Sequence, residues 1–211
     1  MTACVTNRPQ SLTGLPSGGR TKRVAASPSS DLRWAQQLGD IPQTLDARPD
    51  LRAAMRFLLA HHEIPVKVTE GGDRRARRKA ILDALFAGEV TLDAAIADTE
   101  RQLARDDSPH RTSNLVFASG WAKRLVHTHT SVFYSWAVLE YLLASGATQC
   151  FVPHAPAESG TGACSRLLAG HAHDAATLRD RLVACYVAKQ PARAPLIPNH
   201  PHCTHVIAPV P

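Results

Sequence analysis

The chain has 211 residues, a length that suits one domain or one domain with an extended arm. Apolar residues make up 44% of it and aromatic residues only 5%, a composition typical of a helix-rich protein with a modest core. No stretch approaches the ~18 uninterrupted apolar residues of a membrane-spanning helix, and the N-terminus has no apolar run of signal-peptide length. We therefore expect a cytoplasmic protein with no membrane partner.

The net charge of +6 is unevenly distributed. Residues 1–30 are rich in Pro, Gly, Ser and Thr, contain four basic residues and no acidic one, and show no apolar period. We interpret them as a disordered basic arm. A second basic run, DRRARRK, has helical spacing and predicts non-specific contact with nucleic-acid phosphates. The residues of this run that we expect to make the contact are Arg74, Arg75, Arg77, Arg78 and Lys79.

Residues 31–110 are predicted to form a small helical region. The stretch SDLRWAQQLGDIP indicates a short helix capped by Ser30 and ended by Gly39. A second helix is predicted for ARPDLRAAMRFLLAHHE, and a third for GDRRARRKAILDALFAGEV, which stops at Gly88. The fourth, TLDAAIADTERQLARDD, opens with the capping residue Thr91.

The pattern changes over residues 111–211. A long central helix is predicted from Ser113 to Ser145. Two short strands, at 148–153 and 203–208, are expected to pair, and between them lie a cysteine-containing loop and a helix capped by Asp174. The predicted fold class is α+β and predominantly helical. It combines an N-terminal helical region, one long central helix and a small two- or three-stranded antiparallel element with a Cys/His-rich loop near the C-terminus.

Cysteine and histidine gather in the C-terminal half. Four of the five cysteines lie after residue 149, and eight of the eleven histidines lie from residue 127 onward. An odd number of cysteines without regular spacing argues against a disulfide framework. Thiol and imidazole groups are the ligands that zinc prefers, so the clustering indicates a candidate metal site.

Strand periodicity suggests which side chains would meet. Residues two apart on a strand share a face, so Cys203 and His205 point the same way. The candidate is a structural zinc cluster, with zinc as the cofactor and no catalytic residue. Its predicted ligands are Cys164, Cys203 and His205, with a fourth from Cys150, His154 or His173. No CxxC pair is present, and the alternative is that these side chains are core or hydrogen-bonded groups without a metal.

A catalytic site has weaker support in the sequence than a metal site. Cys164 with His173 and Asp174, or with His154, has the residue types of a thiolate, a base and an orienting group, but no cysteine-protease signature accompanies them. The chain also lacks phosphate-loop, dinucleotide-binding and deaminase signatures. The sequence therefore favours a protein that is not an enzyme.

Four stretches in order carry a family resemblance. They are VHTHTSVFYSWAVLEYLLASGAT, QCFVPH, GACSRLLAG and PLIPNHPHCTHVIAPV. Over roughly residues 120–210 they resemble the Mu F-like phage head morphogenesis (minor capsid) proteins. Cys164 and Gly170 match the loop of that family, whereas His127 and His129 replace the Arg and Glu of its helix motif. The positions that match its closing motif are His200, Pro201, Cys203 and His205.

The resemblance implies a virion-assembly protein of phage or prophage origin. Its partners would be portal or capsid proteins, its role structural, and its location the cytoplasm or the virion. One alternative is a metal-dependent zinc hydrolase or toxin-like nuclease that uses the C-terminal Cys/His cluster. Another is a helical interaction protein with a basic arm.

Overall fold

The computed structural model describes residues 34–158, 160 and 162–211. The predicted basic arm at residues 1–30 lies outside these described residues, and so do Cys4 and the predicted cap Ser30. Over the described part the chain is mostly helical with one small antiparallel sheet, which confirms the predicted α+β class. None of the described helices combines the length and apolar character needed to cross a bilayer.

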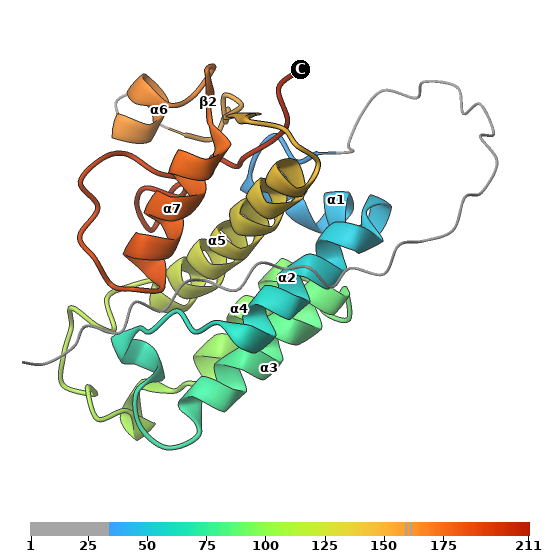
Figure 1. Ribbon diagram of the computed structural model, residues 1–211. Coiled ribbons are helices and arrows are strands. Elements are labelled where there is room, and N and C mark those ends of the chain that lie inside the picture. The colour runs from blue at the N-terminus through green and yellow to red at the C-terminus, as the bar shows by residue number, and fades with distance from the viewer. Residues whose placement is uncertain (1–33, 159, 161) are drawn as a thin grey trace, which may run out of the picture. The chain divides into compact units, whose positions relative to one another are not determined.

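The elements follow one another in a simple order along the chain (Figure 1). The α-helices are α1 (Ile41–Ala47), α2 (Pro49–His61), α3 (Arg74–Ala87), α4 (Leu92–Gln102), α5 (Trp121–Ala144), α6 (Ala163–Leu167) and α7 (Ala175–Tyr186). The strands are β1 (Gln149–Phe151) and β2 (Ala172–Asp174). The short 3₁₀ helices are η1 (Leu38–Asp40), η2 (Lys67–Thr69) and η3 (Arg105–Asp107).

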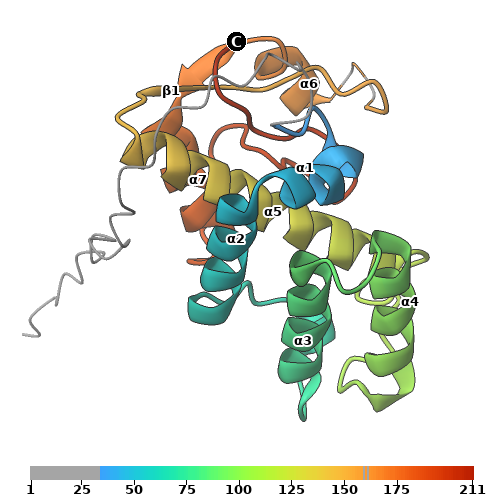
Figure 2. The same ribbon diagram turned by 90° about the vertical axis from the view of Figure 1, so that its right-hand side faces the viewer.

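The long helix α5 is the centre of the packing. It contacts α2 and α4 as well as α7 (Figures 1 and 2). Most of its residues from His129 to Leu139 are fully buried, on every face of the helix. A helix that is buried all round is a core helix, and at ~1.5 Å per residue its 24 residues span about 36 Å. One hydrophobic core, extending from Ala35 to Ile207, joins the predicted 31–110 and 111–211 regions.

Local signals place several helix ends where the sequence predicts them. The Thr91 hydroxyl accepts a hydrogen bond from the Ala94 amide at 3.2 Å and begins α4. The Asp174 carboxylate accepts one from the Thr177 amide at 2.7 Å and begins α7. Gly88, in the left-handed conformation with φ of 80°, ends α3. Side-chain caps and a left-handed glycine are local effects, and for this reason they can be read from sequence.

The central helix is shorter than predicted. It begins at Trp121 instead of Ser113, because Gly120 takes the left-handed conformation with φ of 69° and breaks the helical path. The residues before it form turns that leave Leu115 95% exposed and bury Phe117. Phe117 packs in a small satellite cluster with Val68, Leu103 and Leu125, and this contact requires the chain to turn.

The first predicted helix is also shifted. Residues 34–37 are not helical, and the chain passes through η1 into α1 instead of stopping at Gly39. The Asp40 carboxylate accepts the amides of Gln36 and Gln37, both at 3.1 Å, and holds the preceding chain in an extended path. Pro42 lies in the first turn of α1, where its fixed φ favours helix initiation.

The sheet has a different partner from the predicted one. β1 pairs antiparallel with β2, so that Cys150 faces His173. The C-terminal stretch 195–210, which we call the closing segment, meets β1 only at the Phe151–Ala208 bridge, through mutual hydrogen bonds of 2.7 and 2.9 Å. Bonded pairs in an antiparallel ladder recur every second residue, and the next would need an N–H from Pro153, which has none. The predicted pairing of 148–153 with 203–208 is therefore reduced to one bridge.

A candidate metal centre

The loop after β1 carries the first part of the cluster. The short helix α6 holds Cys164, whose carbonyl accepts the amides of Leu168 and Ala169 at 2.9 and 3.0 Å. The loop returns to β1 at Gly170, whose amide donates to the Val152 carbonyl at 2.7 Å. Gly170 has φ of 80°, which an L side chain rarely adopts. The loop therefore holds Cys164 in the core, where it is fully buried.

The closing segment brings the second part. Its Pro-rich approach is held by α7, where the Tyr186 hydroxyl donates to the Pro198 carbonyl at 3.0 Å. A turn follows, in which the Cys203 amide donates to the His200 carbonyl at 3.0 Å. The Leu38 amide then donates to the Thr204 carbonyl at 2.8 Å, which ties the segment to η1. The turn places His200 and Cys203 on the same side, towards Cys164.

Five side chains converge in this region. Cys164 Sγ lies 3.4 Å from His200 Nε2, and Cys203 Sγ lies 3.7 Å from His205 Nδ1. The ligand atoms of Cys164, His200 and Cys203 all lie within 4.8 Å of one another, and so do those of Glu158, Cys203 and His205. The two groups share Cys203 and together form what we call the Cys/His cluster. These residues lie close enough to bind a metal ion.

Glu158 places an acid beside both histidines. Its Oε1 lies 3.1 Å from His200 Nε2, and its Oε2 lies 3.9 Å from His205 Nδ1. The carboxylate also accepts hydrogen bonds from the amide and hydroxyl of Thr204, at 2.6 and 2.9 Å. Its side chain is only 6% exposed. Glu158 thus fastens the loop to the closing segment and lends negative charge to the cluster.

Burial governs the charge state of the cluster. Desolvation raises the pKa of the Cys203 thiol to about 12, and the neighbouring Cys164 and Glu158 act in the same direction. Desolvation also lowers the pKa of His205, against an opposing effect of Glu158. In the absence of a cation, Cys203 is therefore a neutral thiol and His205 a neutral imidazole. A bound divalent cation would take the place of the thiol proton.

The distances match a tetrahedral site. With sulfur at ~2.3 Å and nitrogen at ~2.0–2.1 Å from zinc, a sulfur and a nitrogen ligand in a tetrahedron lie about 3.6 Å apart. The two sulfur–nitrogen distances in the cluster, 3.4 and 3.7 Å, lie on either side of this value. Thiolate and imidazole ligands suit zinc and other borderline or soft metals more than magnesium or calcium.

The structure brings together three of the six residues predicted from the sequence. Cys164, Cys203 and His205 are in the cluster, whereas Cys150, His154 and His173 do not belong to either ligand group found among the described residues. Instead, Cys150 Sγ lies 3.6 Å from the His173 carbonyl, and desolvation raises the pKa of Cys150 to about 12.

The two excluded histidines have structural contacts of their own. His173 Nε2 lies 2.8 Å from the Leu168 carbonyl. His154 is exposed and covers Gly170, where an added Cβ would lie 2.3 Å from its Nε2. Asp174 caps α7 and His173 contacts the Leu168 carbonyl, so both partners in the predicted combination of Cys164 with His173 and Asp174 are engaged elsewhere. The imidazole beside Cys164 is that of His200.

The predicted ligand set did not include His200 and Glu158. For His200 the sequence carries a signal. Residues three positions apart across a tight turn can point to the same side, and His200 and Cys203 in HPHC have that spacing. For Glu158 no spacing signal exists. It lies 46 residues from Thr204, and only the fold brings the two together.

The basic run on α3 is largely structural. Arg74 is 2% exposed, and its guanidinium donates to the carbonyls of Val68, Leu103 and Ala104 at 2.7–2.9 Å. Arg78 is 4% exposed and donates to the Ile64 carbonyl at 2.7 Å. A buried guanidinium cannot reach a phosphate, so the predicted nucleic-acid contact is wrong for these two residues.

The other three bases of the run are exposed and have partners. Arg75 pairs with Glu63 at 3.2 Å, and Arg77 pairs with Asp73 at 2.9 Å. The Lys79 ammonium donates to the Ala60 carbonyl at 2.8 Å and covers the end of α2. Each base therefore satisfies a group within the helical region.

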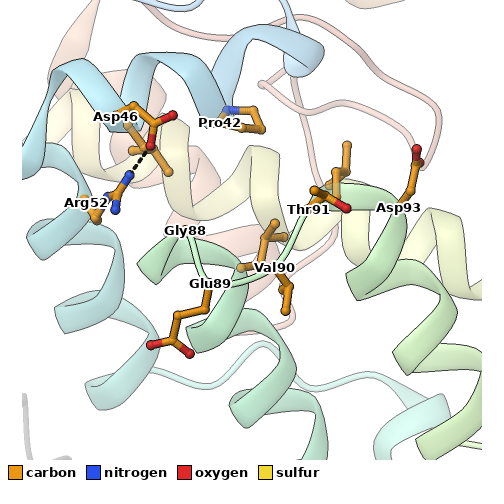
Figure 3. A pocket seen from close by; sticks show the side chains of 11 residues that line it. Pro42, Asp46, Arg52, Gly88, Glu89, Val90, Thr91 and Asp93 are labelled. Carbon is orange, nitrogen blue, oxygen red and sulfur yellow. Dashed lines mark hydrogen bonds and ion pairs between the residues drawn. The ribbon is translucent and has the colours of Figure 1, made fainter.

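A separate hollow of about 430 Å³ lies away from the cluster (Figure 3). It is bordered by α1, the start of α2 and the connection from α3 to α4, and Arg52 crosses it to bind Asp46. The Arg52 guanidinium also donates to the Ala87 carbonyl at 2.6 Å. None of the predicted ligands lines this hollow, so the described pocket and the candidate metal centre are distinct.

Comparisons of the chain with family models, with curated proteins and with solved structures give no match.

Proposed function

We propose that the Cys/His cluster is a structural zinc centre that fastens the C-terminal segment to the helical body of the protein. The observation that carries this proposal is that Cys203 belongs to two groups of close ligand atoms, one with Cys164 and His200 and one with Glu158 and His205, and that the Cys164–His200 and Cys203–His205 distances suit a tetrahedral ion. Two thiolates balance the charge of Zn²⁺, so the two cysteines and two histidines would hold the metal without net charge once the two groups close around it.

Glu158 acts in this proposal as a partner outside the ligand set. Its carboxylate accepts two hydrogen bonds from Thr204, which hold it in place beside the histidines. Adding it as a fifth ligand would leave the buried site with a net negative charge. Its contacts with the histidines involve the nitrogens that would hold the ion, His200 Nε2 and His205 Nδ1, so these contacts would give way to the metal while the hydrogen bonds to Thr204 persist.

The position of the cluster supports a structural role. Cys164 comes from the loop after β1, and the other three ligands come from the closing segment. That segment is otherwise held to the body by one hydrogen bond to η1, two to α7, the mutual pair to β1 and two from Thr204 to Glu158. The Ser131 hydroxyl also donates to the His205 carbonyl at 3.5 Å. A metal at this point would therefore add a cross-link where few backbone bonds exist.

For the protein as a whole we propose a role in virion assembly, as a minor capsid-like protein that binds portal or capsid partners. The support is the resemblance of residues 120–210 to the Mu F-like proteins. The four stretches that carry it correspond to α5, β1, the α6 loop and the closing segment, with β2 and α7 between the last two. The protein would act in the host cytoplasm and remain in the virion.

A zinc hydrolase or nuclease is the second candidate, and Glu158 is the observation that favours it. A carboxylate beside a three-ligand zinc site is the usual position of a general base. That reading requires His205 to leave the fourth position open to water. His205 is 1% exposed, which supports the closed, structural alternative.

Metal analysis of the purified full chain tests the zinc centre. We expect one zinc ion per chain, lost in Cys203→Ser and retained in Cys185→Ser, whose cysteine lies on α7 outside the cluster. A chain that carries no zinc after purification with zinc in the medium, and binds none on titration, would refute the centre. Zinc-dependent hydrolysis that is abolished in Glu158→Gln, while folding and zinc content persist, would favour the enzyme.

The assembly role needs a separate test. Coexpression with the portal and capsid proteins encoded nearest to its gene should yield a stable complex that survives size-exclusion chromatography. Absence of portal and terminase genes from the neighbourhood, or no complex with either protein, would count against it. Neither result depends on whether zinc is bound.

A further inference from the structure

Two of the described cysteines are close neighbours, although they lie far apart in the sequence. Cys164 is fully buried and Cys203 is 3% exposed, and their sulfur atoms lie within 4.8 Å of each other. Both are free thiols. Cys150, on β1, and Cys185, on α7, belong to neither ligand group of the described residues. Among the described cysteines, the fold therefore brings the sulfur atoms of one pair, Cys164 and Cys203, close together.

We propose that Cys164 and Cys203 form a reversible disulfide under oxidation and that its formation releases the metal. This modification site rests on the proposed zinc centre, since both sulfurs are its ligands. The oxidant is a peroxide, which a cell or a virion meets without any partner protein.

The geometry requires only a small movement. A disulfide joins sulfur atoms at ~2.05 Å, so closing from at most 4.8 Å takes less than about 3 Å. Cys164 lies on the five-residue helix α6. Cys203 lies in a turn closed by the hydrogen bond from its own amide to the His200 carbonyl. Neither sulfur is on a long helix or inside a ladder, so side-chain rotation and a local shift of the turn are sufficient.

His200 is the most exposed side chain of the cluster. It is 33% exposed, and its Nε2 lies 3.4 Å from Cys164 Sγ, whereas Glu158 and His205 are nearly buried. Cys164 itself is fully buried, so a peroxide molecule, which is little larger than water, would reach its sulfur by displacing this imidazole.

The chemistry balances with one peroxide for each pair. The zinc-bound thiolate of Cys164 attacks one peroxide oxygen, the O–O bond breaks, and a sulfenic acid forms. The Cys203 thiolate then attacks that sulfur and expels hydroxide. In total, two thiolates, one hydrogen peroxide and two protons yield one disulfide and two water molecules. Each sulfur loses one electron, and the two oxygens of the peroxide gain the two.

Metal release follows from the loss of both anionic ligands. The disulfide leaves only the two histidines and Glu158 near the ion. We expect zinc affinity to fall by more than the ~10–100-fold seen when only an outer partner is removed. A thiol reductant with added zinc should restore the site, because no carbon–sulfur bond is broken and the oxidation stops at the disulfide.

The experiment exposes the full chain, zinc-loaded and zinc-free, to stoichiometric hydrogen peroxide. Released zinc is followed with a chromophoric chelator, and disulfides are mapped by peptide mass spectrometry under non-reducing conditions. We expect a Cys164–Cys203 cross-linked peptide and one zinc ion released for each disulfide. Cys185→Ser should behave as the wild type, and Cys203→Ser should yield no cross-link to Cys164.

The outcomes separate the two proposals. Zinc retained in the absence of the cross-link, a disulfide that joins Cys164 to Cys4 or Cys185, or oxidation that proceeds to sulfinic acid would each overturn the switch and leave the zinc centre standing. A chain that never binds zinc but forms the Cys164–Cys203 cross-link would refute the centre and retain the modification site. Because mapping of the wild-type chain decides this, the conclusion holds even if the serine variants fail to fold.

Discussion

Lowering the pH should destabilise the fold through His129, a buried histidine on α5. His129 is 1% exposed, and its Nδ1 has no hydrogen-bond partner. Desolvation holds the pKa of His129 well below its ordinary value of 6.5, and the Arg78 guanidinium adds to the effect. The folded state therefore keeps a neutral imidazole, whereas the unfolded chain takes up a proton near its ordinary pKa.

The size of the effect follows from this difference. With a depressed folded pKa, the contribution of His129 to stability is complete above about pH 6.5 and is lost as the pH falls towards the folded pKa. Between about pH 6.5 and the folded pKa the loss approaches ~1.4 kcal/mol per pH unit, and below the folded pKa it stops growing. Integrated from about pH 7 to about pH 5, protonation of this one residue in the unfolded chain removes at most about 2 kcal/mol.

Urea unfolding of the wild type and of His129→Leu, at several pH values over this range, measures the effect. The variant should lose up to about 2 kcal/mol less than the wild type as the pH falls. Burial also lowers the pKa values of His62, His127 and His205, but these residues are common to both chains and cancel in the comparison. Equal pH dependence in the two chains would refute the reasoning, because His129 would then titrate alike in the folded and unfolded states.

Gly170→Ala should lower the free energy of unfolding by about 1–2 kcal/mol in urea denaturation, because φ is 80° there. Gly39→Ala, with open space around it, should change it by less than about 0.5 kcal/mol, and equal effects would contradict the left-handed assignment. Arg74→Met leaves three carbonyls without their donor and should cost about 3 kcal/mol or more, whereas the exposed Arg101→Met should cost little. Chelation of zinc present at ~100 times its dissociation constant should remove about 2.7 kcal/mol and lower the melting temperature by about 5–11 °C, a shift that added zinc reverses and added magnesium does not.

The helical part of the fold was largely predictable because its signals are local. Helix α4 begins at the Thr91 cap and α3 ends at Gly88, as their residue types predict. The errors arose where a distant contact overrides a local pattern. Phe117 is buried against Leu103 and Val68, and the chain turns to reach them instead of continuing the helix.

The residue types of the candidate site were predictable from the sequence, but the particular residues that form it were only partly so. The clustering of cysteine and histidine indicated a metal site, and strand periodicity placed Cys203 with His205. Cys150, one of the predicted fourth ligands, instead lies in the core, because β1 pairs with β2 and buries it against the helices. Glu158 had no signal, since its contacts with Thr204 and His200 depend on how the loop folds back.

The sequence by itself determined the helical class, the existence of the central helix, several helix ends and the gathering of metal-binding residue types in the C-terminal half. These features depend on apolar periodicity, caps and composition, which act over a few residues. Only the tertiary structure decided which thiols and imidazoles meet, that Arg74 and Arg78 hold loop carbonyls, and that Glu158 joins the cluster. Those outcomes depend on chain segments tens of residues apart, and their pairing is set by the shape of the shared core.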